Sequence, residues 1–371
     1  MEQRNDILRY PLVRVLLLLV FLYLFFVSIE LLGAAFKLFG KGFAETLLQT
    51  TSHPLIGLFL GILATSVVQS SSATTSIVVG MVASGTLPLG NAVPIIMGAN
   101  IGTTVTNTIV SIGHITRPQE FRRAFAGATV HDFFNFLSVL VFLPLELATH
   151  YLEKSAVALQ KVFVNVGGLK FVSPLKVIVK PAVHLIRDFV LSWGIGKTAA
   201  AVVCLVIALA FLFVALAQIV KLMRSLIIGK VETLIHDYLF QNTLRSLVFG
   251  LLLTAFVQSS SMVTSLAVPL IGAGILSIEQ VFPYTVGANI GTTFTAIMAS
   301  FVTANPTAIA TAFVHLLFNI SGTLLWLPLK RVPIFFAKKL GELAYRKRAL
   351  AFVYVFVVFY GIPLILYFLT K

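Results

Sequence analysis

Long apolar stretches separated by short polar or basic segments run through most of the chain. A helix needs about 20 apolar residues to cross a bilayer. Stretches of about that length predict transmembrane helices at residues 12–39, 124–148, 199–220, 307–329 and 349–369. The pattern therefore predicts an all-α polytopic membrane protein.

Two further regions, residues 55–113 and 246–302, are apolar but interrupted by Gly, Ser, Thr, Asn and Pro. Such interruptions are tolerated at membrane depth only where the backbone lines a cavity or is buried in protein. We expect each region to hold a re-entrant helical hairpin followed by a broken helix. The predicted hairpins and broken helices span, in chain order, residues 55–84, 88–113, 246–274 and 278–302.

These two regions are copies of one another, because residues 61–104 align without a gap with residues 250–293 at an offset of 189. Gln-Ser-Ser-Ser at 69–72 recurs at 258–261, and Gly-Ala-Asn-Ile-Gly-Thr-Thr at 98–104 recurs at 287–293. After a slip of five residues, a His-x-x-x-Asn word also repeats. Two long polar words at one spacing indicate a true internal repeat.

The repeat divides the chain into residues 1–150, a linker at 151–196, residues 197–330, and a C-terminal part at 331–371. Each half should have a leading helix, a hairpin, a broken helix and a closing helix (about 120–148 and 306–329). A hairpin adds no net crossing, so each half crosses three times and the second half is inverted, as in many secondary transporters. With a cytoplasmic N-terminus, the inner segments hold 17 of the 27 Lys and Arg residues, a moderate positive-inside bias because the outer linker is itself basic. The C-terminal part adds a basic amphipathic segment on the membrane surface and a final transmembrane helix.

Composition supports a membrane protein, because only 11% of the 371 residues are charged and 58% are hydrophobic. A soluble chain has about 25% charged residues. A net charge of +14 is also found in nucleic-acid-binding proteins, but here the basic residues form short runs beside apolar stretches, as expected next to lipid headgroups. The single cysteine, Cys204, excludes an internal disulfide and a multi-cysteine metal site. We expect the lipid bilayer as a partner, and neither nucleic acid nor a cofactor.

The repeated Gln-Ser-Ser-Ser word has the chemistry of an ion site at a hairpin tip. The second helix of each hairpin would begin near the serines, where unpaired N–H groups, the positive end of the helix dipole and hydroxyls can hold an oxyanion. The Gln and Ser oxygens also suit a hard monovalent cation. The alternative is that serine only allows close helix packing in the membrane. Two related copies favour the binding site.

The Gly-x-Asn-Ile-Gly-Thr-Thr word predicts a second set of oxygen ligands. Its two glycines can unwind a helix at low cost, so that Asn and Thr oxygens lie beside exposed carbonyls. Oxygen ligands without a carboxylate favour sodium over a divalent metal. The alternative is a kink in which Thr bonds to the preceding turn. We expect each of these words to face a hairpin tip.

Missing charge is the strongest indication of mechanism. No Lys or Arg lies between Lys41 and Arg117, or between Arg245 and Lys330. A buried oxyanion without a counter-charge is costly, so bound cations should balance it. Arg122 and Arg123 are better explained as topology signals at the membrane interface than as substrate ligands.

Asp132 is the main acidic candidate within a predicted span, where ionisable groups are functional candidates by default. It could bind sodium or a proton, or form an interior hydrogen bond to Asn135 or His131. His131 and His315 are better explained by packing or gating than by metal binding, because no carboxylate cluster supports them.

The chain resembles the type II sodium-dependent phosphate cotransporters over most of its length. The resemblance lies in the two Gln-Ser-Ser-Ser words, the two Asn-Ile-Gly-Thr-Thr words and the word Phe121-Arg-Arg-Ala-Phe-Ala-Gly-Ala-Thr-Val-His-Asp132. The resemblance implies sodium-driven phosphate import by alternating access, and it alone specifies phosphate. The phosphate ligands that we then expect are Ser70, Ser71, Ser72, Ser259, Ser260, Ser261, Asn100 and Asn289. The expected sodium ligands are Gln69, Gln258, Thr103, Thr104, Thr292, Thr293, Thr75 and Thr264. Candidate coupling residues are Asp132, Asn135 and Asn319, and sodium is the only metal expected.

The chain also departs from animal members of that family. Its linker is short and lacks their paired cysteines, which fits a bacterial inner-membrane protein. Glu120 is the only acid in the ten residues before the Phe-Arg-Arg word, where charge-moving members have an Asp. The number of sodium ions, the net charge moved and the oligomeric state therefore stay open. Alternatives are a sodium-coupled carrier of sulfate or a carboxylate, and a passive anion channel. A serine hydrolase is disfavoured because no Gly-x-Ser-x-Gly word occurs.

Overall fold

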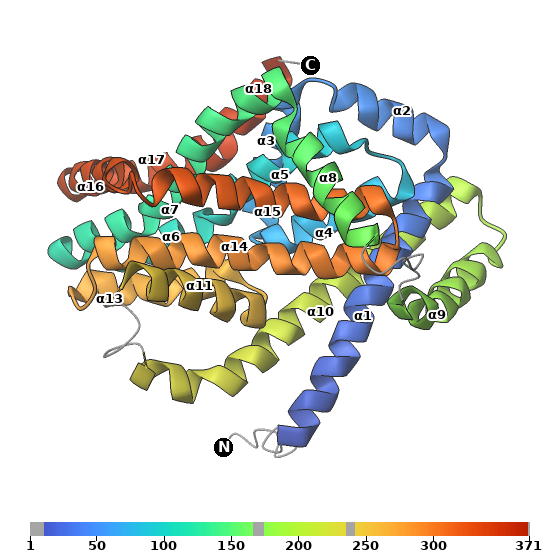
Figure 1. Ribbon diagram of the computed structural model, residues 1–371, viewed down its shortest axis with the longest axis horizontal. Helices are drawn as coiled ribbons and strands as arrows, with labels where there is room; N and C mark the ends of the chain where they lie inside the picture. Colours follow the sequence, from blue (N-terminus) through green and yellow to red (C-terminus); the bar gives the residue numbers. More distant parts are fainter. Residues whose placement is uncertain (1–10, 166–173, 235–241, 370–371) are drawn as a thin grey trace.

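The computed structural model describes residues 11–165, 174–234 and 242–369, and its regular elements within these ranges are all helices (Figure 1). Seven of these helices are long and apolar enough to cross a membrane. The prediction of an all-α polytopic membrane protein is confirmed. The candidate spans are Leu12–Phe39, Leu89–Ile112, Pro118–Thr149, Lys197–Leu222, Ile278–Thr303, Pro306–Trp326 and Ala349–Leu369.

The first half begins with a long apolar helix, continues through a hairpin and a broken helix, and closes with a second long helix. Its elements are α1 (Pro11–Phe39), α2 (Lys41–Thr50), α3 (Pro54–Val68), α4 (Ser71–Ser84), α5 (Leu89–Thr103), α6 (Val105–Ile112) and α7 (Pro118–Thr149). Two amphipathic helices follow in the linker, α8 (Tyr151–Asn165) and α9 (Pro174–Leu191).

The second half repeats this order. Its elements are α10 (Lys197–Leu234), α11 (Thr243–Val257), α12 (Ser260–Ser265), α13 (Ala267–Ala273), α14 (Ile278–Thr303) and α15 (Pro306–Trp326). The hairpin helices α3 and α11 have the same bounds once the sequence offset of 189 is applied, and so do α4 and the α12–α13 pair. The sequence repeat is thus a repeat of structure. The inverted direction of the halves stays a prediction.

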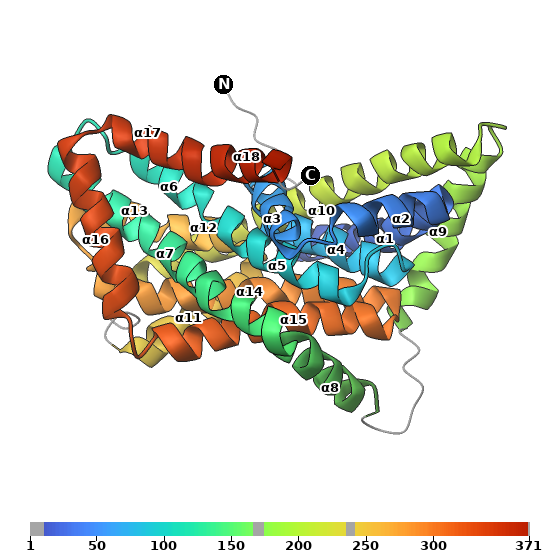
Figure 2. The ribbon, with the colours of Figure 1, turned by 90° about the horizontal axis from the view of Figure 1, so that it is seen from above.

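The C-terminal part packs onto the first half. Its elements are α16 (Arg331–Arg346), α17 (Ala349–Phe356), the π-helical turn η3 (Val357–Gly361) and α18 (Ile362–Leu369). Helix α16 crosses α7, and the chain then returns along α6 and α3 (Figure 2). The two leading helices, α1 and α10, pack on each other. Helix α4 of the first hairpin packs against α1, α14 and α15, and helix α11 of the second packs against α14 and α10.

Each hairpin reverses at the glutamine of its Gln-Ser-Ser-Ser word. Gln69 and Gln258 have left-handed backbones, with φ of 55° and 63°, a conformation that ends helices. Ser70 and Ser259 then cap the next helix, because their hydroxyls accept hydrogen bonds from the N–H groups of Ala73 (3.2 Å) and Met262 (3.3 Å). The polar word therefore specifies both the turn and the start of the second helix.

The second helix of the second hairpin is interrupted at Leu266, between α12 and α13. Pro269 lies three residues further on. Proline has no N–H to donate to the carbonyl of the residue four before it, here Ser265, and its ring crowds that carbonyl. The first hairpin has Gly80 at the equivalent position, and α4 is continuous.

The break in the first Gly-x-Asn-Ile-Gly-Thr-Thr helix lies at Thr104, between α5 and α6. The Thr104 N–H bonds to the carbonyl of Ile101, not to that of Asn100. The Asn135 amide donates to the Asn100 carbonyl (2.8 Å), and the Ser261 hydroxyl donates to that of Thr103 (3.4 Å). Side chains from elsewhere in the chain therefore bind the carbonyls at the break.

The break that the sequence predicts in the second copy is not present, because α14 runs without interruption from Ile278 to Thr303. Asn319, the counterpart of Asn135, donates to the His315 carbonyl and to the Asn100 side chain. The Asn319 amide therefore bonds to groups other than the Asn289 carbonyl, which is the equivalent of the Asn100 carbonyl. The same seven letters form a broken helix in one half and a continuous helix in the other.

The glycines of these words serve close packing, which differs from the unwinding that the sequence predicts. A Cβ atom at Gly98 would overlap the carbonyl oxygen of Leu58, and one at Gly287 would overlap that of Leu247. The first helix of each hairpin thus touches the adjacent helix backbone to backbone. This contact fixes each hairpin against α5 or α14.

Candidate functional site

A cavity of about 340 Å³ lies between the two hairpin tips. All eight residues of the two Gln-Ser-Ser-Ser words line it, from both halves of the chain. Its other lining residues are the apolar Val68 of α3 and Phe213, Leu216, Ala217 and Val220 of α10. The structure therefore brings together two words that lie 189 residues apart.

Hydroxyls and helix starts give this cavity its chemistry. Ser71, Ser72, Ser260 and Ser261 are buried, in the first turns of α4 and α12. The first N–H groups of a helix have no partner within the helix, and they carry the positive end of its dipole. Two helix starts with their serines therefore present donors to one space.

The cavity has no charged side chain among its lining residues in the described part of the chain. An anion there would meet only dipoles and hydroxyls. The sequence argument from missing Lys and Arg thus applies to the cavity itself. A bound anion would need a cation of its own to balance its charge.

The two glutamines differ in environment. Gln258 is buried, and its Oε1 atom accepts a hydrogen bond from Thr295 (2.7 Å). The Thr295 hydroxyl also lies 3.3 Å from that of Ser72. Gln69 is exposed. The second tip is thus tied to α14 and to the first tip, whereas the Gln69 side of the cavity is open.

Thr295 is a site residue that the sequence reasoning missed. It lies two residues after the repeated Thr-Thr pair, and Thr106 is its counterpart at the same offset of 189. The repeat therefore extends past the mismatch of Val105 with Phe294. Extending the alignment by two residues would have identified Thr295 as the counterpart of Thr106.

The threonines predicted as sodium ligands do not line the cavity. Each hydroxyl donates to a carbonyl three or four residues earlier, the pattern expected of Thr in a membrane helix. The pairs are Thr75 with Ser71, Thr103 with Ala99, Thr104 with Ile101, Thr264 with Ser260, Thr292 with Ala288, and Thr293 with Ile290. Their sodium role stays a prediction.

Thr264 has a second partner that sequence reasoning did not identify. Its hydroxyl lies 2.7 Å from Nδ2 and 3.1 Å from Oδ1 of Asn107 on α6. Both residues are buried. This pair joins the second hairpin to the broken helix of the first half.

Asn100 and Asn289 lie in a buried network behind the cavity. Nε2 of His131 is 2.9 Å from Oδ1 of Asn289, and Nε2 of His315 is 3.4 Å from Oδ1 of Asn100. The Asn289 amide also donates to Oδ1 of Asn135 (2.8 Å) and of Asn319 (2.9 Å). Each half thus supplies a histidine to the asparagine of the other.

The network is reciprocal under the sequence repeat, because Asn135 bonds to Asn289 while Asn319 bonds to Asn100 (3.2 Å). All six side chains are buried. Buried polar groups of this kind are costly unless paired. The network therefore links the halves, and the amides of Asn100 and Asn289 bond within it rather than into the cavity.

Asp132 is fully buried and lies outside the cavity lining. Its Oδ2 atom accepts hydrogen bonds from Tyr354 on α17 (2.8 Å) and from Thr108 on α6 (3.1 Å). These partners differ from the Asn135 or His131 expected from sequence. Asp132 thus connects the C-terminal helix to the broken helix, and its coupling role stays a prediction.

The profile of the Na+/Pi-cotransporter family matches residues 24–173 and 211–365. The chain belongs to this family. It is 38% identical to sodium-dependent phosphate transport protein 2B of Pongo abelii and of Homo sapiens, over 95% of this chain and 64% of each relative. It is also 38% identical to protein 2A of Ovis aries, over 95% of this chain and 67% of that protein.

The resemblance to type II sodium-dependent phosphate cotransporters is thus confirmed, and the relatives are transport proteins, not enzymes. The chain spans about two thirds of the length of these relatives. No solved structure matches the chain.

Two arginines of the Phe-Arg-Arg word, Arg122 and Arg123, lie away from the cavity. Arg123 donates to the Gly272 carbonyl (2.8 Å) at the end of α13, which is the base of the second hairpin. Arg122 pairs with Glu342 of α16 (3.3 Å). Hydrogen bonds from Arg346 and then Arg122 lower the pKa of Glu342, against the effect of desolvation. Both arginines therefore hold helices together.

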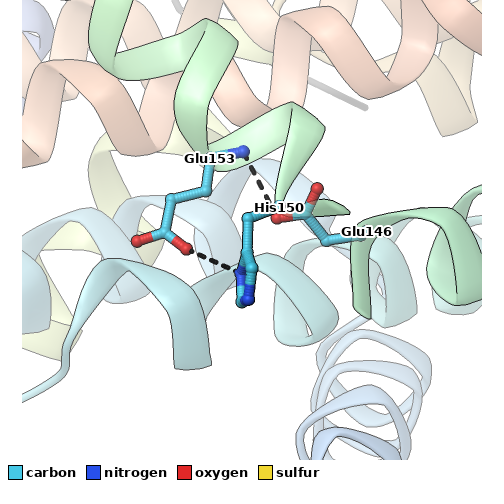
Figure 3. Close-up of side chains that lie close together, drawn as sticks. All are labelled: Glu146, His150 and Glu153. Carbon is cyan, nitrogen blue, oxygen red and sulfur yellow. Dashed lines mark hydrogen bonds and ion pairs between the residues drawn. The ribbon is translucent and has the colours of Figure 1, made fainter. Parts of the chain in front are cut away.

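A cluster of Glu146, His150 and Glu153 lies at the corner between α7 and α8 (Figure 3). The two carboxylate oxygens of Glu146 accept hydrogen bonds from the N–H groups of Leu152 (2.7 Å) and Glu153 (3.3 Å). Nδ1 of His150 lies 3.3 Å from a Glu153 oxygen. Glu146 thus caps the start of α8, and the structure explains the cluster as a helix junction.

Proposed function

We propose that this protein is a sodium-coupled symporter that imports inorganic phosphate by alternating access. The observation that carries the proposal is the neutral cavity lined by both Gln-Ser-Ser-Ser words. Membership of the Na+/Pi-cotransporter family and the names of the relatives support sodium and phosphate as the cargo.

Phosphate would bind between the two helix starts. The hydroxyls of the two serine triplets and the free N–H groups of α4 and α12 would donate to its oxygens, as at other helix N-termini that bind phosphate. Their arrangement about one space suits a tetrahedral anion. Phosphate ligands on both halves would couple binding to the relative position of the halves.

Sodium would supply the charge that the cavity lacks. Phosphate carries one or two negative charges near neutral pH, and a dry site without a counter-charge would exclude it. Gln69, Gln258 and backbone carbonyls at the tips offer neutral oxygens of the kind that sodium prefers. Anion and cation would thus stabilise each other's binding, which is a coupling free energy between two ligands.

Uptake into proteoliposomes tests the proposal. The purified protein would be reconstituted and given labelled phosphate under an inward sodium gradient, or under a potassium gradient of the same size. We expect accumulation above equilibrium only with sodium. Equal uptake in the two gradients would contradict sodium coupling. So would an internal phosphate concentration that never rises above the external one.

Competition identifies the cargo. Unlabelled phosphate should abolish sodium-driven uptake of the label, whereas sulfate and a small carboxylate at the same concentration should leave it unchanged. Stronger inhibition by sulfate or the carboxylate would assign the transporter to another oxyanion.

A further inference from the structure

A second cavity, of about 240 Å³, lies between α1 and α9. Ile29, Glu30 and Lys37 line it from α1, and Lys180, His184 and Arg187 line it from α9. Ala83 and Thr303, at the far ends of α4 and α14, also contribute. None of its lining residues belongs to the cavity at the hairpin tips.

The charges around this second cavity are mostly positive. Lys37, Lys180 and Arg187 are basic, and Glu30 is the one acidic side chain among the described lining residues. Within the described part of the chain, the side chains of Lys37 and Lys180 form no hydrogen bond or ion pair. Two ammonium groups on different helices thus face one hollow without an anionic partner.

Arg187 is held in a position that suits anion binding. Its guanidinium donates to Asp188 (2.9 Å) and lies 3.4 Å from Nδ1 of His184. Asp188 is exposed and is not among the lining residues. The arginine is therefore anchored from outside the cavity, while its side chain contributes to the lining.

A third cavity, near the base of the second hairpin, provides a contrast. Arg122 and Lys338 line it, but each pairs with a carboxylate in the same lining, Glu342 (3.3 Å) and Glu279 (2.6 Å). The positive charge there is already balanced within the cavity. Of these two basic cavities, only the one between α1 and α9 has unpaired lysines.

We propose that the cavity between α1 and α9 is a second anion site, which takes a tetrahedral phosphate group through Lys37, Lys180 and Arg187. Two lysines and an arginine carry +3, and Glu30 in the same lining carries −1, so the sum of +2 matches the charge of a phosphate dianion. Arginine also adds directional donors. The phosphate group belongs either to inorganic phosphate or to the headgroup of an anionic phospholipid. This site is separate from the proposed transport site, since the two cavities share no lining residue.

Its place in the fold connects it to the hairpin. Helix α4 starts at the central cavity with Ser71 and ends beside the second cavity at Ser84, a length of about 21 Å for its 14 residues. Helix α14 likewise carries Thr295 near the tips and Thr303 at the second cavity. A bound anion would therefore lie at the opposite end of the two helices that contribute Ser72 and Thr295.

Lysine acylation read by mass spectrometry tests the site without relying on transport. The intact protein in an uncharged detergent would be treated with an acetylating reagent in phosphate, or in chloride of equal ionic strength. Lys161, an exposed lysine of α8 outside this cavity, is the matched control. A second arm would use nanodiscs of phosphatidylglycerol or of phosphatidylcholine, without inorganic phosphate.

We expect Lys37 and Lys180 to lose reactivity in phosphate while Lys161 does not, and the Arg187→Gln variant to restore that reactivity. Protection by phosphatidylglycerol alone would assign the same site to a lipid headgroup. Equal reactivity in all four conditions, or equal protection of Lys161, would overturn the proposal. Ser260→Ala, at the hairpin tip, should keep the protection of both lysines, which separates this site from the proposed transport site.

Discussion

The hydroxyl of Ser261 donates a hydrogen bond to the main-chain carbonyl of Thr103, 3.4 Å away. One residue belongs to the second hairpin tip, and the other lies next to the break between α5 and α6. The Ser72 hydroxyl contacts the opposite half in a similar way, through Thr295. Each tip is therefore held by the half of the chain to which it does not belong.

Loss of a cavity hydroxyl should weaken phosphate transport. Ser260→Ala removes one donor, and a hydrogen bond to a charged group contributes about 1.5–3 kcal/mol, so we expect the KM for phosphate to rise by about 10- to 100-fold. Labelled phosphate uptake in saturating sodium measures it. Ser265→Ala is the control, because that hydroxyl bonds to the Met262 carbonyl and does not line the cavity. Equal KM values for both variants would refute the site.

Gln258 should act mainly on sodium. Its side-chain oxygen lies at the tip and accepts from Thr295, and Gln258→Ala removes it without touching a serine. We expect the sodium concentration for half-maximal uptake to rise severalfold, while the KM for phosphate in saturating sodium changes little. Sodium titrations at fixed phosphate measure this. An unchanged sodium dependence would exclude Gln258 from the cation site.

Filling the cavity from α10 should block transport. Ala217 is small and lines the space between the tips, so Ala217→Trp should abolish uptake while the protein still folds. Val206→Trp places the same bulk on an exposed residue of α10 outside the cavity. Normal uptake in the first variant, or equal loss in both, would argue against a transport path through this cavity.

The backbone contact at Gly287 should tolerate no side chain. Gly287→Ala places a methyl group against the Leu247 carbonyl, and overpacking of this kind costs about 1–3 kcal/mol or more. We expect a clear fall in the melting temperature of the detergent-solubilised protein. Gly42→Ala on α2 should have no such effect, because nothing lies within 4 Å of its Cβ position. A normal melting temperature for Gly287→Ala would refute the contact.

The asparagine network should behave as one unit. Asn289→Ala leaves buried groups of His131, Asn135 and Asn319 without a partner, each at about 1–3 kcal/mol. Thermal unfolding should show a large loss of stability. Asn91→Ala, which removes two bonds to Thr51 at a half-buried site, should cost less. Equal losses would contradict a buried network.

The helix pair that meets at each Gln-Ser-Ser-Ser word was predictable, because each word is a polar interruption of an apolar stretch. That the hairpins are re-entrant stays a prediction. Polar residues within an apolar membrane segment indicate a functional role. The constant offset of 189 between the two words indicated that the two tips are equivalent. Left-handed Gln69 and the Ser70 cap follow from local chemistry, which a sequence displays directly. The meeting of the two tips around one cavity was therefore within reach of sequence reasoning.

Other parts depended on contacts between distant residues. Identical words gave a broken helix at Thr104 and a continuous one in α14, because Asn135 and Ser261 bond to carbonyls at the first break. Nothing in the sequence indicated that Nε2 of His315, 215 residues away, lies 3.4 Å from Oδ1 of Asn100. The phosphate role of Asn100 stays a prediction. The contribution of α10 to the cavity lining could not be predicted, since its apolar residues resemble those of any membrane helix.

We expect the unequal copies of the seven-letter word to make the two halves unequal in stiffness. In the first, side chains donate hydrogen bonds to the carbonyls at the break, and these bonds can break and re-form as neighbouring residues move. In the second, α14 runs without a break over 26 residues, although Pro283 inside it cannot donate a backbone N–H. The two copies thus differ in what binds their backbone carbonyls, and we expect any bending of these helices during the proposed transport cycle at residues 100–108, where side chains bind the carbonyls.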